Sequence, residues 1–166
     1  MSYLIEKTNY FQIEHCGSCP IPGYLIVMPR GQSTSLSQMS PEALHALGPV
    51  LAHATRLIEK AVKPLNVYCA KFGEEDRLVH FHLFPRTEWI SRKYRKSFGP
   101  SEIVHGPLLL DWARDTFQGS ECGDIPPPSV EEVVDSMRVI ANTAQQILNR
   151  TPEPSTGFRN GSSRAG

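Results

Sequence analysis

Two histidines separated by a single residue are the feature of this sequence that says most about chemistry. His80 and His82 lie in the segment 78–86, which reads LVHFHLFPR. Successive side chains of a β-strand point to opposite faces, so both imidazoles would share one face and the apolar residues that alternate with them would form a core face. At a rise of about 3.3 Å per residue, the two rings would stand about 7 Å apart along the strand. The spacing therefore predicts paired imidazoles on one side of a sheet.

Three kinds of structure fit such a pair. Two partly buried histidines could simply be hydrogen-bonded to backbone groups. Burying two titratable side chains on one strand face costs free energy, however, so a pair with no function is less expected. In a zinc site, His15, Cys16 and Cys19 would supply the further ligands that zinc normally needs, but a single Cys-x-x-Cys pair is a weak signal. In a nucleophilic site, one neutral imidazole attacks phosphorus while its second nitrogen is held as a donor. We favour the nucleophile.

The elements that must position the histidines are five short segments with strand character: 3–5, 10–15, 24–28, 65–72 and 78–84. Only the polar residues 73–77 separate the last two, and so short a loop predicts antiparallel neighbours. A long helix is expected from the N-cap Ser40 and Pro41 to about Lys63. The pattern predicts an α+β fold, with this helix packed against a five-stranded antiparallel sheet.

A helical extension is expected over about residues 89–150. It would contain a short helix over 107–117 and a long helix that starts at a capping box of Ser129 and Glu132. We interpret the basic run 92–96 as a solvated face. Beyond residue 150, proline, serine, glycine and arginine dominate and cannot bury enough surface to order the chain. We therefore expect one domain over 1–150 and a disordered tail over 151–166.

Composition narrows the class of protein. The chain has 166 residues, four cysteines, and seventeen basic and seventeen acidic residues, which give zero formal net charge. That balance argues against binding long nucleic acid through bulk electrostatics. No stretch approaches the roughly 20 apolar residues of a membrane span, and the first residues lack the layout of a secretory signal. We expect a cytoplasmic protein with no membrane partner, whose cysteines remain thiols.

The motif and the elements before it resemble the histidine-triad superfamily of nucleotide hydrolases and transferases. The signature of that family alternates three histidines with apolar residues and commonly ends in Pro-Arg. Segment 78–86 fits this pattern with Leu78 in place of the first histidine. The upstream order is also similar, with a turn that ends at Gly23, a strand to Pro29 and a helix that opens at Ser40. The resemblance covers residues 3–87, about half of the chain.

The resemblance implies roles for individual residues. His80 takes the place of the nucleophilic middle histidine, and His82 takes that of the third histidine, which binds and neutralises the phosphate. Glu74 falls where many members have a glutamine that contacts the phosphate, and Arg86 matches the trailing arginine. Tyr24 is a further candidate for the substrate site, where it could stack on a base. Family members usually form two-fold dimers, and the apolar strand 24–28 is compatible with a homodimer.

The implied reaction has two steps. His80 attacks the α-phosphorus of a nucleotide conjugate, of the dinucleoside polyphosphate or phosphoramidate type, and forms a nucleotidyl-histidine that water then hydrolyses. The resemblance implies no cofactor and no metal, because His82, arginine and backbone donors supply the electrostatic stabilisation. Because Leu78 and Glu74 depart from the family pattern, a catalytically weak nucleotide-binding module is an alternative. A zinc-binding protein that uses His15, Cys16 and Cys19 is another.

Overall fold

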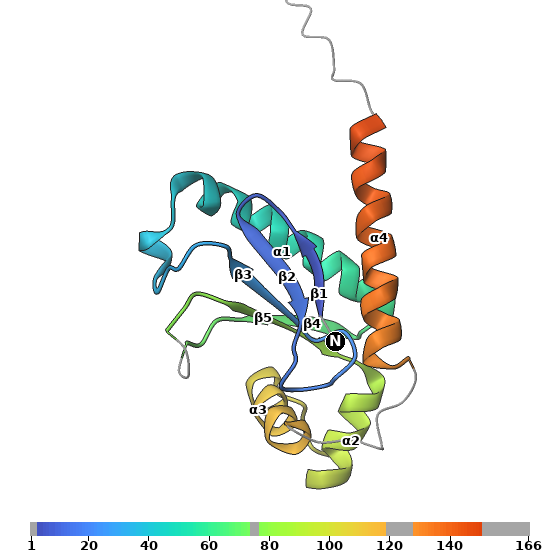
Figure 1. The fold of residues 1–166 in the computed structure, drawn as a ribbon. Helices are drawn as coiled ribbons and strands as arrows, with labels where there is room; N and C mark the ends of the chain where they lie inside the picture. The colour runs from blue at the N-terminus through green and yellow to red at the C-terminus, as the bar shows by residue number, and fades with distance from the viewer. Residues whose placement is uncertain (1–2, 74–76, 119–127, 151–166) are drawn as a thin grey trace, which may run out of the picture.

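The computed structural model describes residues 3–73, 77–118 and 128–150, and the fold is α+β as expected (Figure 1). Glu74 and the tail 151–166 lie outside the described residues. A single antiparallel sheet has the strand order β1-β2-β3-β5-β4. Its strands are β1 (Leu4–Lys7), β2 (Phe11–His15), β3 (Leu25–Pro29), β4 (Asn66–Ala70) and β5 (Phe81–Arg86). The predicted five-stranded antiparallel sheet is confirmed.

Four α-helices and a short 3-10 helix (Leu36–Gln38) complete the described fold. They are α1 (Pro41–Val62), α2 (Glu88–Phe98), α3 (Gly106–Phe117) and α4 (Val130–Arg150). The predicted caps are in place, since Ser40 accepts a hydrogen bond from the Ala43 amide and Ser129 accepts one from the Glu132 amide. No helix in the described part of the chain is both long and apolar enough to cross a membrane.

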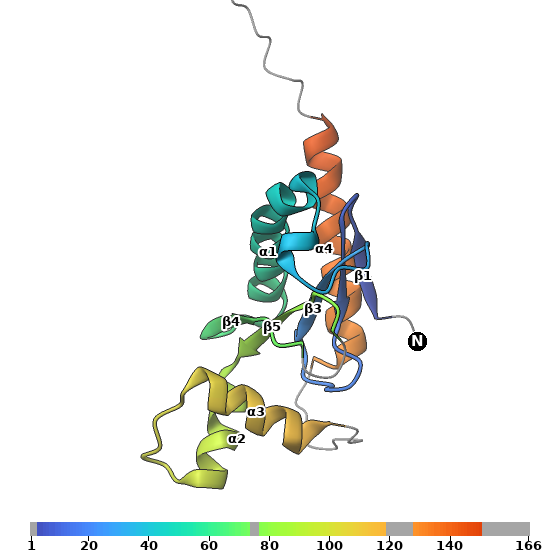
Figure 2. The ribbon, with the colours of Figure 1, turned by 90° about the vertical axis from the view of Figure 1, so that its left-hand side faces the viewer.

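The helices pack in two pairs against different parts of the sheet. Helices α1 and α4 lie side by side on one side of the strands, and α2 and α3 lie together on the other (Figures 1 and 2). Leu25 and Val27 of β3 face the α1 and α4 core, whereas Ile26 between them belongs to the cluster with α2 and α3. This explains why the strand is a continuous apolar run. It also places the strand inside the sheet, so the predicted compatibility of segment 24–28 with a dimer contact is wrong.

Two local predictions differ from the structure. Strand β5 begins at Phe81 rather than at residue 78, because the Val79 amide donates to the Ser33 carbonyl (2.7 Å) and not to a neighbouring strand. The alternation of faces persists nevertheless, with Val79 buried and Leu78 exposed. The basic run 92–96 lies in helix α2, which the sequence analysis did not predict. Its N-cap Thr87 accepts from the Ile90 amide, so a local signal was present.

Candidate active site

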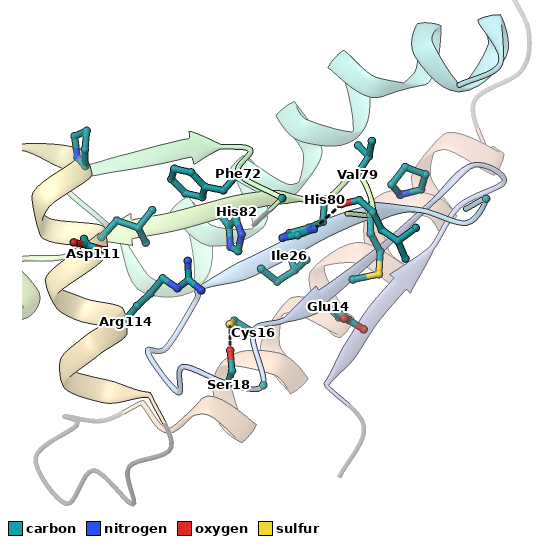
Figure 3. A pocket seen from close by; sticks show the side chains of 18 of the residues that line it. Glu14, Cys16, Ser18, Ile26, Phe72, Val79, His80, His82, Asp111 and Arg114 are labelled. Atoms are coloured by element: carbon teal, nitrogen blue, oxygen red, sulfur yellow. Dashed lines mark hydrogen bonds between the residues drawn. The ribbon is translucent and has the colours of Figure 1, made fainter. Parts of the chain in front are cut away.

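The two histidines of the motif line one cavity, as predicted. It has a volume of about 630 Å³, within the range of small-molecule sites. Strand β3 contributes Ile26 and Met28 to its wall, the segment before β5 contributes Leu78, and α3 closes the far side (Figure 3). The cavity therefore forms where one face of the inner strands of the sheet meets the helical extension.

His80 is fixed by the main chain of its own segment. Its Nδ1 lies 2.9 Å from the carbonyl oxygen of Leu78, and the ring is partly buried at the cavity wall. A carbonyl oxygen only accepts hydrogen bonds, so Nδ1 carries the proton in this contact. The side chain at position 78 is exposed and takes no part in that bond. A main-chain hydrogen bond thus orients the imidazole.

His82 is more deeply placed and is held by a second side chain. Only 7% of the residue is exposed, and its Nδ1 lies 2.8 Å from the Tyr24 hydroxyl. Its ring meets the His80 ring edge to face, with centroids 4.8 Å apart, and packs against Phe72 at 5.7 Å. These aromatic contacts and the hydrogen bond together fix the ring of His82.

Tyr24 lies behind His82 rather than in the cavity wall. It is completely buried, and its ring packs edge-on against Phe84. Burial raises the pKa of the Tyr24 hydroxyl well above its usual range, so the group stays protonated. In this position Tyr24 cannot stack on a base, so the predicted role in base binding is wrong. It hydrogen-bonds to the imidazole of His82 instead.

Of the two remaining candidates from the sequence, the structure describes only Arg86. Arg86 donates from Nε to the Ser91 hydroxyl and from Nη1 to the Tyr68 hydroxyl, both at 3.3 Å, and does not line the cavity. Glu74 falls outside the described residues. The structure therefore gathers His80, His82 and Tyr24 and leaves Arg86 apart.

Two charged residues of α3 line the cavity that the sequence analysis had not singled out. Figure 3 shows Arg114 extending from α3 toward His82 and Cys16, with Asp111 one turn earlier on the helix. Both lie about thirty residues beyond the motif, and no local pattern marks them, since charged residues on an amphipathic helix usually face solvent. Glu14 of β2 also lines the cavity, and burial raises the pKa of its carboxyl.

The zinc interpretation does not fit the structure. His15 is buried and its two ring nitrogens lie 3.0 and 2.9 Å from the carbonyl oxygens of Cys16 and Ile21. The Cys19 thiol donates to the carbonyl of Ala113 at 3.9 Å. Within residues 3–73, 77–118 and 128–150, no three histidine, cysteine or acidic side chains are grouped closely enough to hold a metal. The proposed set of His15, Cys16 and Cys19 is therefore wrong.

Comparison with known proteins identifies solved structures that share this fold. No family model matches the chain, and no curated protein sequence matches it. Many solved structures resemble it. A histidine triad nucleotide-binding protein from Sulfolobus tokodaii has 15% identity and a TM-score of 0.54, and the match covers 92% of both chains. A zinc-bound histidine triad family protein from Mycobacterium smegmatis has 14% identity and a TM-score of 0.55, over 89% of this chain and 88% of the other.

An enzyme gives a third match. The diadenosine triphosphate hydrolase of Plasmodium falciparum has 10% identity and a TM-score of 0.53, over 85% of this chain and 77% of the other. These matches extend past residue 87, so the likeness includes part of the helical extension as well as the sheet. The chain therefore has the fold of the histidine-triad proteins, as its His-x-His motif and flanking elements had indicated.

Proposed function

We propose that this protein is a nucleotide hydrolase or nucleotidyl transferase that cleaves at the α-phosphate of a nucleotide conjugate through a covalent intermediate on His80. The observation that carries the proposal is the contact of His80 Nδ1 with the Leu78 carbonyl, at the wall of a cavity of nucleotide size. With the proton on Nδ1, the lone pair of the ring lies on Nε2. That nitrogen is the nucleophile.

The reaction proceeds by two displacements at phosphorus. His80 Nε2 forms a bond to the α-phosphorus, and the bond from phosphorus to the leaving group breaks, with its electron pair going to the leaving group. Water then attacks the same phosphorus and the P–N bond breaks, which returns the electron pair to Nε2 and releases a nucleoside monophosphate. An alcohol or amine acceptor in place of water gives the transferase reaction. Splitting one difficult displacement into two is the advantage of a covalent intermediate.

The absence of the first histidine of the family pattern does not weaken this mechanism. The group that orients His80 is the main-chain carbonyl at position 78, which every residue type provides. Leucine therefore preserves the hydrogen bond between His80 Nδ1 and the carbonyl of residue 78. A departure in sequence here leaves the geometry of the nucleophile intact.

His82 acts as the donor that stabilises the phosphoryl oxygens. In this mechanism the protonated Tyr24 hydroxyl, 2.8 Å away, is the donor to Nδ1 of His82, and the neutral ring carries its proton on Nε2. That edge of the ring is turned away from the buried tyrosine, and His82 lines the cavity. An N–H at this position hydrogen-bonds to an oxygen whose negative charge grows in the transition state.

Trapping the intermediate tests the proposal. The full chain is mixed with a nucleotide conjugate and quenched rapidly, and the adduct is located by mass spectrometry of peptides kept at alkaline pH. We expect a nucleotidyl group on His80, and we expect His80→Asn to lose the adduct and at least ~1,000-fold in kcat. His45→Asn, at an exposed position of α1, is the control and should retain both.

Two other results would contradict the proposal. Turnover that survives in His80→Asn would show that another group reacts with the phosphorus. Nucleotide binding without turnover across a panel of conjugates would instead identify the protein as a binding module. Glu14 and Asp111 favour that second outcome to some extent, because their carboxylates line the same cavity and repel phosphate when ionised.

A further inference from the structure

Helix α3 brings a fixed positive charge to the cavity, and the proposed reaction leaves that charge unexplained. Arg114 is partly buried and is the only lysine or arginine among the described residues that line the cavity. The two histidines already serve the reacting phosphate in the proposed mechanism. The position of Arg114 relative to them indicates which part of a substrate it would meet.

The arrangement along the cavity places Arg114 on the leaving-group side. Figure 3 shows His80 and Arg114 on opposite sides of His82, with the guanidinium turned toward the His82 ring. A displacement at phosphorus is in line, so the leaving group departs on the side away from the nucleophile. With His80 as the nucleophile, that side is the one on which α3 and Arg114 lie.

Arg114 also acts electrostatically on the Tyr24 hydroxyl that lies behind His82. Burial raises the pKa of the Tyr24 hydroxyl, and the positive charge of Arg114 acts in the opposite direction on the same group. Coulomb interactions of this kind fall off with distance and are screened by solvent. Arg114 therefore acts on the hydroxyl that is hydrogen-bonded to His82, in agreement with its place in the cavity wall.

Close packing holds α3 in register over the sheet. At Gly106, the first residue of the helix, a Cβ atom would lie 3.0 Å from the Tyr68 ring of β4, so the backbone approaches the aromatic ring as closely as it can. Ala113 is fully buried, and its carbonyl accepts from the Cys19 thiol. The residue before Arg114 is thus anchored, which keeps the guanidinium over the cavity.

We infer that α3 forms the recognition site for a charged leaving group, with Arg114 as its cation, and that the protein prefers conjugates whose leaving group is a phosphate over those whose leaving group is an uncharged amine. This inference rests on the proposed function, since it uses His80 to define the leaving-group side. A guanidinium forms charge-assisted hydrogen bonds with phosphate oxygens and has no such partner on an uncharged amine. The substrate class is therefore that of polyphosphate conjugates, such as dinucleoside polyphosphates.

Binding measurements test this inference separately from catalysis. Dissociation constants are measured by calorimetry for one nucleoside 5′-monophosphate and for the α,β-methylene analogue of its triphosphate, which cannot be cleaved at the α-phosphate. We expect the wild-type protein to bind the analogue more tightly. In Arg114→Gln, the preference for the analogue over the monophosphate should fall by about 10-fold, the value of one or two hydrogen bonds to a charged group.

Two further variants sharpen the result. Arg114→Lys keeps the charge without the planar fork and should restore part of the preference. Arg92→Gln removes an exposed arginine of α2 outside this cavity and should leave the preference within about 2-fold. An unchanged preference in Arg114→Gln would overturn the inference, and so would an equal loss for both ligands, which would assign Arg114 to the α-phosphate or to the fold.

The failure of the proposed function gives a different pattern. If no adduct forms on His80 but the triphosphate analogue still binds through Arg114, the reaction is wrong and the phosphate site on α3 stands. If the adduct forms and Arg114→Gln keeps its preference, only the inference about α3 is wrong. A protein that binds neither ligand contradicts both.

Discussion

Two chemically identical rings have different hydrogen-bond partners, which favour different tautomers. The Leu78 carbonyl holds a proton on Nδ1 of His80, whereas the Tyr24 hydroxyl faces Nδ1 of His82. A carbonyl can only accept, so Nδ1 of His80 carries the proton in its contact, whereas a hydroxyl can donate, and in the proposed mechanism it donates to Nδ1 of His82. At the scale of the residue, the proposed division between a nucleophile and a donor thus follows from the polarity of one atom beside each ring.

Replacing Tyr24 tests this division. Tyr24→Phe removes the hydroxyl that fixes the tautomer of His82 but preserves the buried ring that packs against Phe84. We expect kcat to fall by about 5- to 10-fold, the worth of one hydrogen bond, while KM changes less. Steady-state kinetics with a polyphosphate conjugate provide the measurement.

The matched control for this variant removes a hydroxyl outside the cavity. Tyr68→Phe deletes the acceptor of Arg86 Nη1 and should leave kcat within about 2-fold of wild type. A kcat for Tyr24→Phe equal to that of wild type would mean that His82 does not depend on its partner. A fall in thermal stability without a change in kcat would assign Tyr24 to the fold alone.

At the scale of the element, His15 holds the turn that joins β2 to β3. Its ring lies between the carbonyl oxygens of Cys16 and Ile21 and, when neutral, donates to one of them at a time. Cys16 also lines the cavity. Burial lowers the pKa of His15 below 6.5, although the two carbonyl contacts and the charge of Glu131 on α4 act in the opposite direction. The folded protein therefore favours the neutral ring.

This balance predicts how stability depends on pH. Because the pKa of His15 is lower in the folded state than in the unfolded state, unfolding takes up a proton once the pH falls below about 6.5. The free energy of unfolding should then decrease by up to about 1.4 kcal/mol per pH unit until the folded-state pKa is reached. Denaturant titrations at about pH 7.5 and about pH 5.5 measure the decrease.

A variant isolates the contribution of this histidine. His15→Asn should be less stable than wild type at neutral pH but should lose less stability on acidification. His45→Asn, at an exposed position of α1, should lose as much as wild type. Equal pH dependence in wild type and His15→Asn would show that other groups govern the acid response.

The elements that the sequence predicted are those with a local signal. The N-cap at Ser40 and the capping box at Ser129 mark helix starts, and strict alternation placed His80 and His82 on one face. Helix α2 was not predicted as an element of its own although Thr87 caps it, because the basic run 92–96 was interpreted only as a solvated face. The position of Arg114 could not be predicted, since it depends on how α3 packs over residues far away in the chain.

At the scale of the whole molecule, a homodimer stays a prediction, and we expect it to form through β4. The sheet ends at β1 and β4. At β1, Arg138 of α4 donates from Nε and Nη2 to the Leu4 carbonyl, which covers that edge (Figure 1). Strand β4 pairs with β5 along one side, and its outer edge is where a second copy can add a strand.

Light scattering checks this expectation. The wild-type protein should have twice the monomer mass of 18.5 kDa. Cys69→Lys puts a charge at an exposed position of β4 and should shift the mass toward that of the monomer, because lysines on an edge strand oppose pairing. Val139→Lys, on the exposed face of α4, is the control and should remain dimeric. A wild-type mass of 18.5 kDa at every concentration would contradict the prediction.

The two-sided burial of β3 has a consequence for how such a protein can change over evolutionary time. Ile26 and Val27 are neighbours in sequence, yet one belongs to the cluster with α2 and α3 and the other to the core with α1 and α4. The sheet thus separates two clusters of buried side chains. We expect substitutions in the α2 and α3 cluster to change substrate specificity with little effect on the packing of the α1 and α4 core, so that related proteins can diverge in specificity while they keep their stability.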